Sequence, residues 1–321
     1  MFISLDAGFR GDEMMNLFEI INITQLKKDY QIESFTLVDF TVGFDDLIYL
    51  LFSQSVPDRI DGIFVNTIAN TQYIAIAIVF DWSAKCVCNT NFCDFGILEF
   101  NYHFIRPLKN HIMLIGARCE YHNQDNIEQN VLILDEKGAK VKKLCFGDGI
   151  EDCITTAEGS IIVSYFDEGV FGNYGWNKPI GSSGLIVWDA EGNIIWENKK
   201  YSIYDCYAMN IDSNNRLWFY YYSDFDLVCT DFRSDIVIHP DISGCNAFAL
   251  SVTQRKILFS GGYNDSSFYQ CSLDISHSKI GKKQKEEIKI DNRSIEKPIC
   301  HFHGSKLLFL VDNALYGFYF I

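Results

Sequence analysis

The chain has 321 residues and a net charge of −15, from 42 acidic against 27 basic residues, and 48% of its residues are hydrophobic. This apolar content excludes a disordered chain. The negative charge disfavours direct binding to nucleic acid and favours a basic partner. The eleven cysteines are an odd number without the close spacing of a disulfide scaffold, so mostly reduced thiols are expected.

The first residues do not have the pattern of a secretion signal. Asp6, Arg10 and Asp12 interrupt the apolar run that a signal peptide needs. The longest apolar run, residues 73–80, is long enough for a strand and too short to span a bilayer. We therefore expect a cytoplasmic protein without membrane contact.

Alternating strands dominate the predicted elements in chain order. Residues 14–30 combine a helical period with β-branched residues, so this segment is ambiguous between helix and strand. Residues 73–82 and 95–105 are predicted strands. From there to the C-terminus, alternating apolar and polar residues are bounded by Gly, Asn and Asp turns, as in strands of an antiparallel fold.

Two neighbouring segments repeat one order of elements. Residues 130–167 and 184–224 each consist of a strand, an Asp-x-x-Gly turn, a strand, an acidic residue followed by Cys, and two further strands. Two later segments resemble the repeat more weakly. The aspartates that mark the four copies are separated by 54, 42 and 43 residues; they are Asp135, Asp189, Asp231 and Asp274. Four short antiparallel strands with their turns fit this spacing, which is typical of a propeller blade.

The sequence thus predicts an all-β fold, a single β-propeller domain over residues 1–321. About six four-stranded blades are expected, with seven as the alternative count. A strand from the N-terminal segment should pair with the strands in residues 307–320, because this closes the ring and removes exposed edges. The charge-dense segment at about 277–297 is interpreted as a charged loop insertion between the last two blades.

The stretch 147–176 is the strongest candidate for a binding surface. It is acidic, and it leads into a loop, 167–183, that is longer than an ordinary hairpin and rich in aromatic residues. Such loops on a rigid scaffold are typical recognition surfaces. Alternatively, the acids cap turns and the aromatic residues pack between blades. The predicted partner-binding residues are Asp148, Glu151, Asp152, Asp167, Glu168, Phe171, Tyr174 and Trp176.

The sequence contains no catalytic signature. Gly-x-Ser-x-Gly, a Walker loop, His-Glu-x-x-His and a dinucleotide fingerprint are all missing. A non-enzymatic protein without cofactor or resident metal is therefore expected. The alternative is a lactonase-like propeller hydrolase or lyase with Ca²⁺ in the central channel, held by inward-facing oxygens of several blades. Its candidate ligands are Asp46, Asp152, Asp205 and Asn246.

The Asp-x-x-Gly turns and the strand at 159–167 resemble those of bacterial six-bladed propellers distantly related to the NHL and WD40-like groups. A Trp-Asp dipeptide of the WD40 kind occurs at Trp188 and Asp189. The acidic, motif-poor profile is similar to immunity proteins of contact-dependent growth inhibition systems. That resemblance implies a monomer that binds and neutralises a basic toxin, for example a nuclease. A scaffold subunit of a larger complex is a further alternative.

Overall fold

The computed structural model describes residues 15–60, 63–263, 265–295 and 298–320. Asp6, Arg10 and Asp12 of the N-terminal segment lie outside these residues. Strands make up 53% of the chain and helices 6%, so the fold is all-β, as predicted. No helix in the described ranges is long and apolar enough to cross a membrane.

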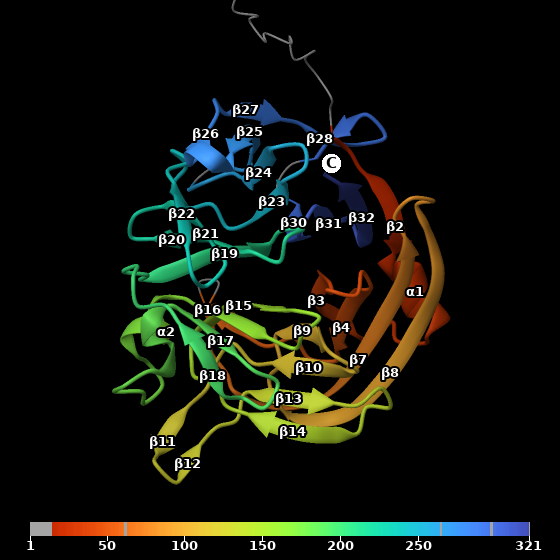
Figure 1. The fold of residues 1–321 in the computed structure, drawn as a ribbon. Helices are drawn as coiled ribbons and strands as arrows, with labels where there is room; N and C mark the ends of the chain where they lie inside the picture. The colour runs from red at the N-terminus through yellow and green to blue at the C-terminus, as the bar shows by residue number, and fades with distance from the viewer. Residues whose placement is uncertain (1–14, 61–62, 264, 296–297, 321) are drawn as a thin grey trace, which may run out of the picture.

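Six sheets of four or five strands surround a common centre (Figure 1). Blade 1 contains β3 (Thr36–Val42), β4 (Ile48–Ser53), β7 (Ile68–Asp81) and β8 (Cys86–Phe100). Blade 2 contains β9 (Phe104–Leu108), β10 (His111–Ile115), β13 (Val131–Leu134) and β14 (Lys140–Leu144). Blade 3 contains β15 (Ile150–Thr155), β16 (Ile161–Tyr165), β17 (Leu185–Trp188) and β18 (Ile194–Glu197).

The second half of the ring is built in the same way. Blade 4 contains β19 (Asp205–Ile211), β20 (Leu217–Tyr222), β21 (Asp226–Thr230) and β22 (Asp235–Ile238). Blade 5 contains β23 (Phe248–Ser251), β24 (Lys256–Ser260) and β25 (Phe268–Asp274), with β26 (Lys279–Ile280) and β27 (Gln284–Glu286) both paired to β25. Blade 6 contains β30 (Ile299–His303), β31 (Lys306–Val311), β32 (Ala314–Tyr319) and β2 (Phe18–Asn22).

A seventh, smaller sheet joins β1 (Met15–Asn16), β28 (Ile288–Ile290) and β29 (Arg293–Ser294). Its residues share an apolar cluster with blades 5 and 6. The described chain therefore holds seven sheets of three or more strands, six of them full-sized, against a prediction of about six blades with seven as the alternative. The first strand of each full-sized blade contacts the first strand of the next, and β30 contacts β3 to complete the circle.

Pairing of the two chain ends closes the ring, as predicted. β2 lies antiparallel to β32, with Phe18 opposite Gly317 and Asn22 opposite Ala314. The ambiguous N-terminal segment divides at Asn22. Before this residue the chain is strand, and after it the side chain of Asn22 accepts the N–H of Gln25 and begins α1 (Ile23–Asp29).

The repeat found in the sequence is offset by half a blade. Residues 130–167 supply the two outer strands of blade 2 and the two inner strands of blade 3, and residues 184–224 do the same for blades 3 and 4. In both copies the side chain of the first turn aspartate, Asp135 or Asp189, accepts backbone N–H groups of its own turn. The repeated turn thus lies at the outer edge of each blade.

The segment predicted as a charged loop insertion contains short strands instead. Between residues 277 and 295 the chain forms β26, β27, β28 and β29. Ile288 and Ile290 alternate with polar neighbours and are buried, which explains why this polar segment is held against the blades.

β2, the strand that closes the ring, should stabilise the whole propeller through its buried side chain. Ile20 of β2 is buried in the cluster between blades 6 and 1, whereas its neighbour Glu19 is exposed. Ile20→Ala should lower the free energy of unfolding by about 2–4 kcal/mol, measured by urea denaturation. Glu19→Ala, the matched control in the same strand, should change it by less than about 0.5 kcal/mol. Equal stability of the two variants would contradict this role of β2.

Candidate functional site

One face of the ring carries three long connections. They join the second and third strands of blades 1, 2 and 3, at residues 54–67, 116–130 and 166–184. The first contains the hairpin of β5 (Arg59–Ile60) and β6 (Ile63–Phe64), and the second that of β11 (Tyr121–Asn123) and β12 (Asn126–Ile127). The third contains α2 (Asp167–Phe171) and the 3₁₀ helix η1 (Ile180–Ser183). Because strand directions alternate, these connections emerge on one side, called the loop face below.

A buried arginine ties the loop face together. The Arg118 side chain is 1% exposed and donates to both carboxylate oxygens of Asp148, over 2.9 and 2.8 Å, and also to Glu168. Asp148 in addition accepts the backbone N–H of Cys119 at 2.8 Å. These hydrogen bonds fix three segments to one another: the long connection of blade 2, the junction between blades 2 and 3, and α2.

The two aromatic residues predicted as partner anchors belong to this same arrangement. Trp176 is buried and donates its Nε1–H to the carbonyl of Cys119 at 2.7 Å. The Tyr174 ring lies 4.1 Å from the Arg118 guanidinium, and its hydroxyl donates to the carbonyl of Val65.

The prediction is therefore corrected for the buried Asp148 and Trp176, whereas the half-exposed Glu168 and Tyr174 stay predicted contacts. Asp148 and Trp176 are buried, and Glu168 and Tyr174 are engaged by Arg118. These side chains hold the loops in place because an arginine from a neighbouring blade supplies the charge and the ring contact that they need.

Asp152 of β15 also has a partner within the chain. Arg106 of β9, 3% exposed, donates to Asp152 at 2.6 Å and to Asp39 of β3 at 2.7 Å. A cavity beside it, lined among others by Thr41, His301 and His303, has a volume of only about 10 Å³. A space of this size holds one water molecule at most.

The four alternative metal ligands are not gathered at one point. Asp152 is paired with Arg106, Asp46 contacts Lys306, and the side-chain oxygen of Asn246 accepts the Ser260 hydroxyl at 2.7 Å. Asp205 lies in the acidic group described next. Three of the four candidate Ca²⁺ ligands thus already have a partner within the chain, and the Ca²⁺ site stays a prediction.

Three acidic residues of the loop face form an acidic group: Glu151 of β15, Asp167 of α2 and Asp205 of β19. Burial, together with the nearby charge of Asp205, raises the pKa of Glu151 to about 8, and the charge of Arg59 opposes this shift. Burial and the charge of Asp167 raise the pKa of Asp205 to about 7. Oδ1 of Asp205 is buried without a hydrogen-bond partner among the described residues.

Exposed aromatic rings continue from this group across blades 3, 4 and 5. Phe171 contacts Tyr204 at 5.3 Å between ring centroids, and Tyr204 lies 6.3 Å from Tyr222. Phe225 lies 5.4 Å from Tyr222 and 5.9 Å from Tyr263. Phe171 is 64% exposed, Tyr263 56%, Tyr204 43% and Tyr222 42%, so these rings form an open band.

The acidic group and the aromatic band meet at Asp205. This residue follows Tyr204 in the chain and is paired with Tyr222 across the β19–β20 ladder. We call the combined set, to which Tyr207 also belongs, the acidic-aromatic surface. Of the predicted residues it contains Glu151, Asp167 and Phe171. The other rings were missed, although the tyrosines in YSIYDCY and YYYSDF at the strand ends of the second repeat copy are a signal for them.

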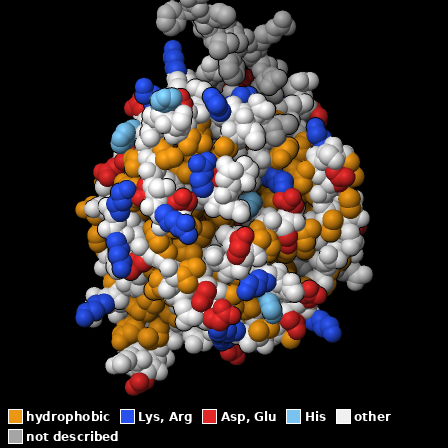
Figure 2. Space-filling view, viewed as in Figure 1, with side chains coloured by type: hydrophobic (Ala, Val, Ile, Leu, Met, Phe, Trp, Pro, Cys, Tyr) orange, Lys and Arg blue, Asp and Glu red, His pale blue; other side chains and the backbone are white. Residues whose placement is uncertain are grey.

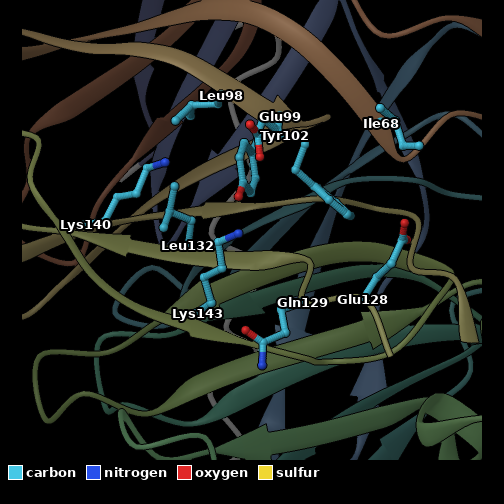
Figure 3. A pocket seen from close by; sticks show the side chains of 10 residues that line it. Ile68, Leu98, Glu99, Tyr102, Glu128, Gln129, Leu132, Lys140 and Lys143 are labelled. Atoms are coloured by element: carbon cyan, nitrogen blue, oxygen red, sulfur yellow. The ribbon is translucent and has the colours of Figure 1, made fainter. Parts of the chain in front are cut away.

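Other hollows of the surface lie elsewhere. One of about 240 Å³ lies between blades 1 and 2, where Glu99 and Glu128 are accompanied by Lys140 and Lys143 (Figure 3). Another, of about 710 Å³, is lined by Phe80, Trp82 and other residues next to β2. On the side of the molecule shown in Figure 2, acidic and basic side chains are interspersed among apolar ones.

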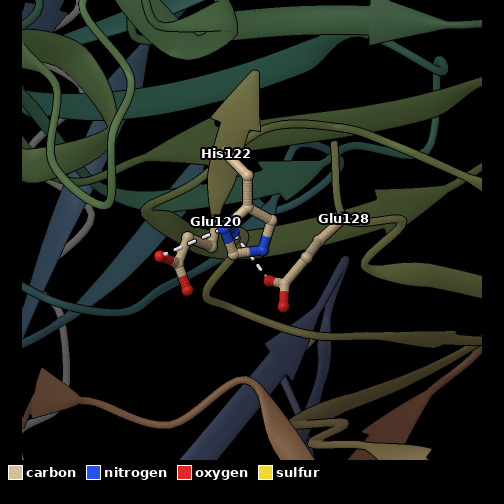
Figure 4. A group of neighbouring side chains, drawn as sticks. All are labelled: Glu120, His122 and Glu128. Atoms are coloured by element: carbon tan, nitrogen blue, oxygen red, sulfur yellow. Dashed lines mark hydrogen bonds and ion pairs between the residues drawn. The ribbon is translucent and has the colours of Figure 1, made fainter. Parts of the chain in front are cut away.

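One group of potential metal ligands occurs in the described residues, at the base of the β11–β12 hairpin (Figure 4). Ligand atoms of Glu120, His122 and Glu128 lie within 4.8 Å of one another. Both oxygens of Glu128 already accept hydrogen bonds, from the Thr67 hydroxyl at 3.0 Å and the Glu120 N–H at 2.7 Å. His122 Nδ1 lies 3.5 Å from Glu120. These existing contacts account for the convergence of the three side chains.

Comparison with known proteins gives a partial family match. A model described as the YxzG family matches residues 181–311, from η1 to β31. This part includes Asp205 and the aromatic residues of blades 4 and 5, and it excludes Glu151, Asp167 and Phe171. No curated protein matches the chain.

Several solved structures are similar in shape at very low sequence identity. A chain of the mitotic checkpoint complex matches with a TM-score of 0.49 and 10% identity, covering 100% of this chain and 97% of that one. YCF48 bound to D1 peptide matches with 0.49 and 9%, covering 97% and 98%. The Cps50 (Swd1) β-propeller domain of Myceliophteria thermophila matches with 0.46 and 10%, covering 89% and 99%. Likeness at this level assigns no activity to the chain.

The raised pKa values of the acidic group predict a pH-dependent stability. The folded state keeps protons on Glu151 and Asp205 that the unfolded chain releases above its ordinary carboxyl pKa, so stability should fall as pH rises from about 5 to 9. Glu151→Gln and Asp205→Asn should each reduce this fall by about 1 kcal/mol or more, measured by urea denaturation at several pH values.

The control for this pH profile is Glu158→Gln, which alters an exposed acid of the same blade and should leave the profile of the wild type unchanged. A wild-type profile in both Glu151→Gln and Asp205→Asn would show that these carboxyl groups ionise as freely in the folded protein as in the unfolded chain.

Proposed function

We propose that this propeller is a non-enzymatic binding protein whose acidic-aromatic surface receives a basic segment of a partner protein. The observation that carries the proposal is the carboxylate of Asp205, which has a buried oxygen without a partner among the described residues and whose neighbours in the chain and across the ladder are the exposed Tyr204 and Tyr222. A lysine or arginine side chain placed there would satisfy this oxygen and contact the ring faces.

The contrast between Asp205 and two other acids, Asp148 and Asp152, supports this choice. Asp148 is paired with Arg118, and Asp152 with Arg106, so the fold itself supplies a cation for each. No salt bridge to Asp205 is formed within the described residues. A buried carboxylate without a cation is costly, and a basic partner would remove that cost on binding.

The aromatic band supplies the apolar part of the same surface. Tyrosine and phenylalanine rings are frequent centres of binding energy in protein interfaces, because they bury a large area with little loss of side-chain freedom. Here the rings contact one another and stand on the ends of rigid strands, so little ordering is needed when a partner binds.

A more specific proposal follows from the charge. With a net charge of −15, the chain would attract a cationic protein over long distances and could cover a cationic active site. We propose a cytoplasmic, monomeric immunity protein that neutralises a basic toxin, for example a nuclease of a contact-dependent inhibition system. A scaffold subunit that recruits a basic protein would use the same surface.

Binding should depend on the rings and on the partner's positive charge. Labelled arginine-containing peptides, compared by fluorescence anisotropy with peptides in which citrulline replaces arginine, test the charge. We expect at least one sequence for which the arginine form binds tenfold or more tightly. Tyr204→Ala and Asp205→Asn should each weaken this binding by about tenfold or more.

The matched control is Tyr319→Ala, because Tyr319 is 41% exposed, like Tyr204, but belongs to blade 6. It should bind as the wild type does. Equal binding of arginine and citrulline forms, or equal loss in Tyr319→Ala and Tyr204→Ala, would refute the proposed surface. The immunity role would be supported by a toxin that the wild-type protein pulls down and Tyr204→Ala does not. Co-expression of the wild-type protein should then protect cells against that toxin.

A further inference from the structure

Two cysteines on the loop face are placed to react with each other. The sulfurs of Cys119 and Cys145 lie 3.7 Å apart, at van der Waals contact, although the two residues are separated by 26 positions in the chain. All eleven cysteines are free thiols in the structure; besides Cys119, five are buried, and Cys86 and Cys88 are exposed in β8. We propose that Cys119 and Cys145 are a redox-active thiol pair that a hydroperoxide oxidises to a disulfide.

The surroundings assign different roles to the two thiols. Cys145 is partly exposed, so an oxidant can reach it, whereas Cys119 is fully buried. The hydrogen bond from Cys119, aided by the N–H of Gly147, holds the pKa of Cys145 below its usual range. Cys145 is therefore the thiol that reacts first with the hydroperoxide. Cys119 is the thiol that then attacks the oxidised Cys145 and forms the disulfide.

The chemistry needs one hydroperoxide for each disulfide. The Cys145 thiolate attacks the terminal peroxide oxygen, the O–O bond breaks, and the alcohol leaves with the proton of the thiol, which gives a sulfenic acid at Cys145. Cys119 then loses its proton and attacks the Cys145 sulfur, and hydroxide leaves as water. Two thiols and one hydroperoxide thus yield one disulfide, one alcohol and one water.

The geometry requires a small movement only. A disulfide bond is about 2.05 Å long, so the two sulfurs must approach by about 1.7 Å from their 3.7 Å separation. Cys119 is held from both sides, since its N–H donates to Asp148 and its carbonyl accepts from Trp176. The partly exposed Cys145 is thus the residue that would move.

A bridge at this position would add a covalent link to the Arg118 arrangement. It would enclose β13, β14 and the β11–β12 hairpin in one loop and fix Cys119, to which Trp176 is bonded. Cross-links of this kind restrict the unfolded chain. The oxidised protein should therefore melt several degrees above the reduced protein.

The test treats the reduced, full-length protein with hydrogen peroxide, blocks the remaining thiols and maps the peptides by mass spectrometry. We expect one cross-linked peptide pair that joins Cys119 to Cys145, two fewer free thiols, and full reversal by dithiothreitol. Cys88→Ser, which removes an exposed cysteine of β8, should form the same bridge. In Cys119→Ser, dimedone should trap a sulfenic acid at Cys145.

Two results would overturn the proposal. One is wild-type protein in which both thiols remain open to blocking while Cys86 or Cys88 is oxidised. The other is a Cys145 sulfenic acid that accumulates in the wild type without a bridge. Both are read from the wild-type chain, so the outcome does not depend on the folding of any variant.

Discussion

The ion pair between Arg118 and Asp148 is the contact on which the loop face depends. Both side chains are almost fully buried, and together with Glu168 they join loops of blade 2 to blade 3. Removing one member of such a pair leaves an uncompensated charge in the interior, which is far more costly than the net gain from forming the pair. The positions of Tyr174, Trp176 and Phe171 all follow from it, because α2 is anchored through Glu168.

The same principle distinguishes acids that support the fold from those that remain available. Arg106 satisfies Asp39 and Asp152 inside the channel, and Arg118 satisfies Asp148. Glu151 and Asp205 are also partly withdrawn from water, yet neither forms a salt bridge with a cation among the described residues. Partly buried carboxyl groups without a cation of the chain beside them can ionise when another molecule supplies that cation.

The fold could be predicted from the sequence because its signals are local. The hydrogen bonds that stabilise each Asp-x-x-Gly turn join residues at most four positions apart, as those of Asp135 and Asp189 show. Each copy of the turn can therefore be recognised in the sequence. The surface could be predicted only in part. Asp148 and Asp205 are both aspartates beside a predicted inner strand, and what distinguishes them is Arg118, which lies 30 residues before Asp148 and forms no ion pair with Asp205 among the described residues. The burial of Trp176 likewise depends on a carbonyl 57 residues away.

The pairing of β2 with β32 also has a consequence for synthesis of the chain. β2 is made before blades 1 to 5 and its ladder partner β32 is made after them, so β2 stays unpaired while five blades are made. Blades 1 to 5 draw their strands from contiguous segments and can form as they emerge. During translation the unfinished ring thus exposes β2 and the apolar edge of blade 1, a surface for chaperones to protect until the last hairpin arrives.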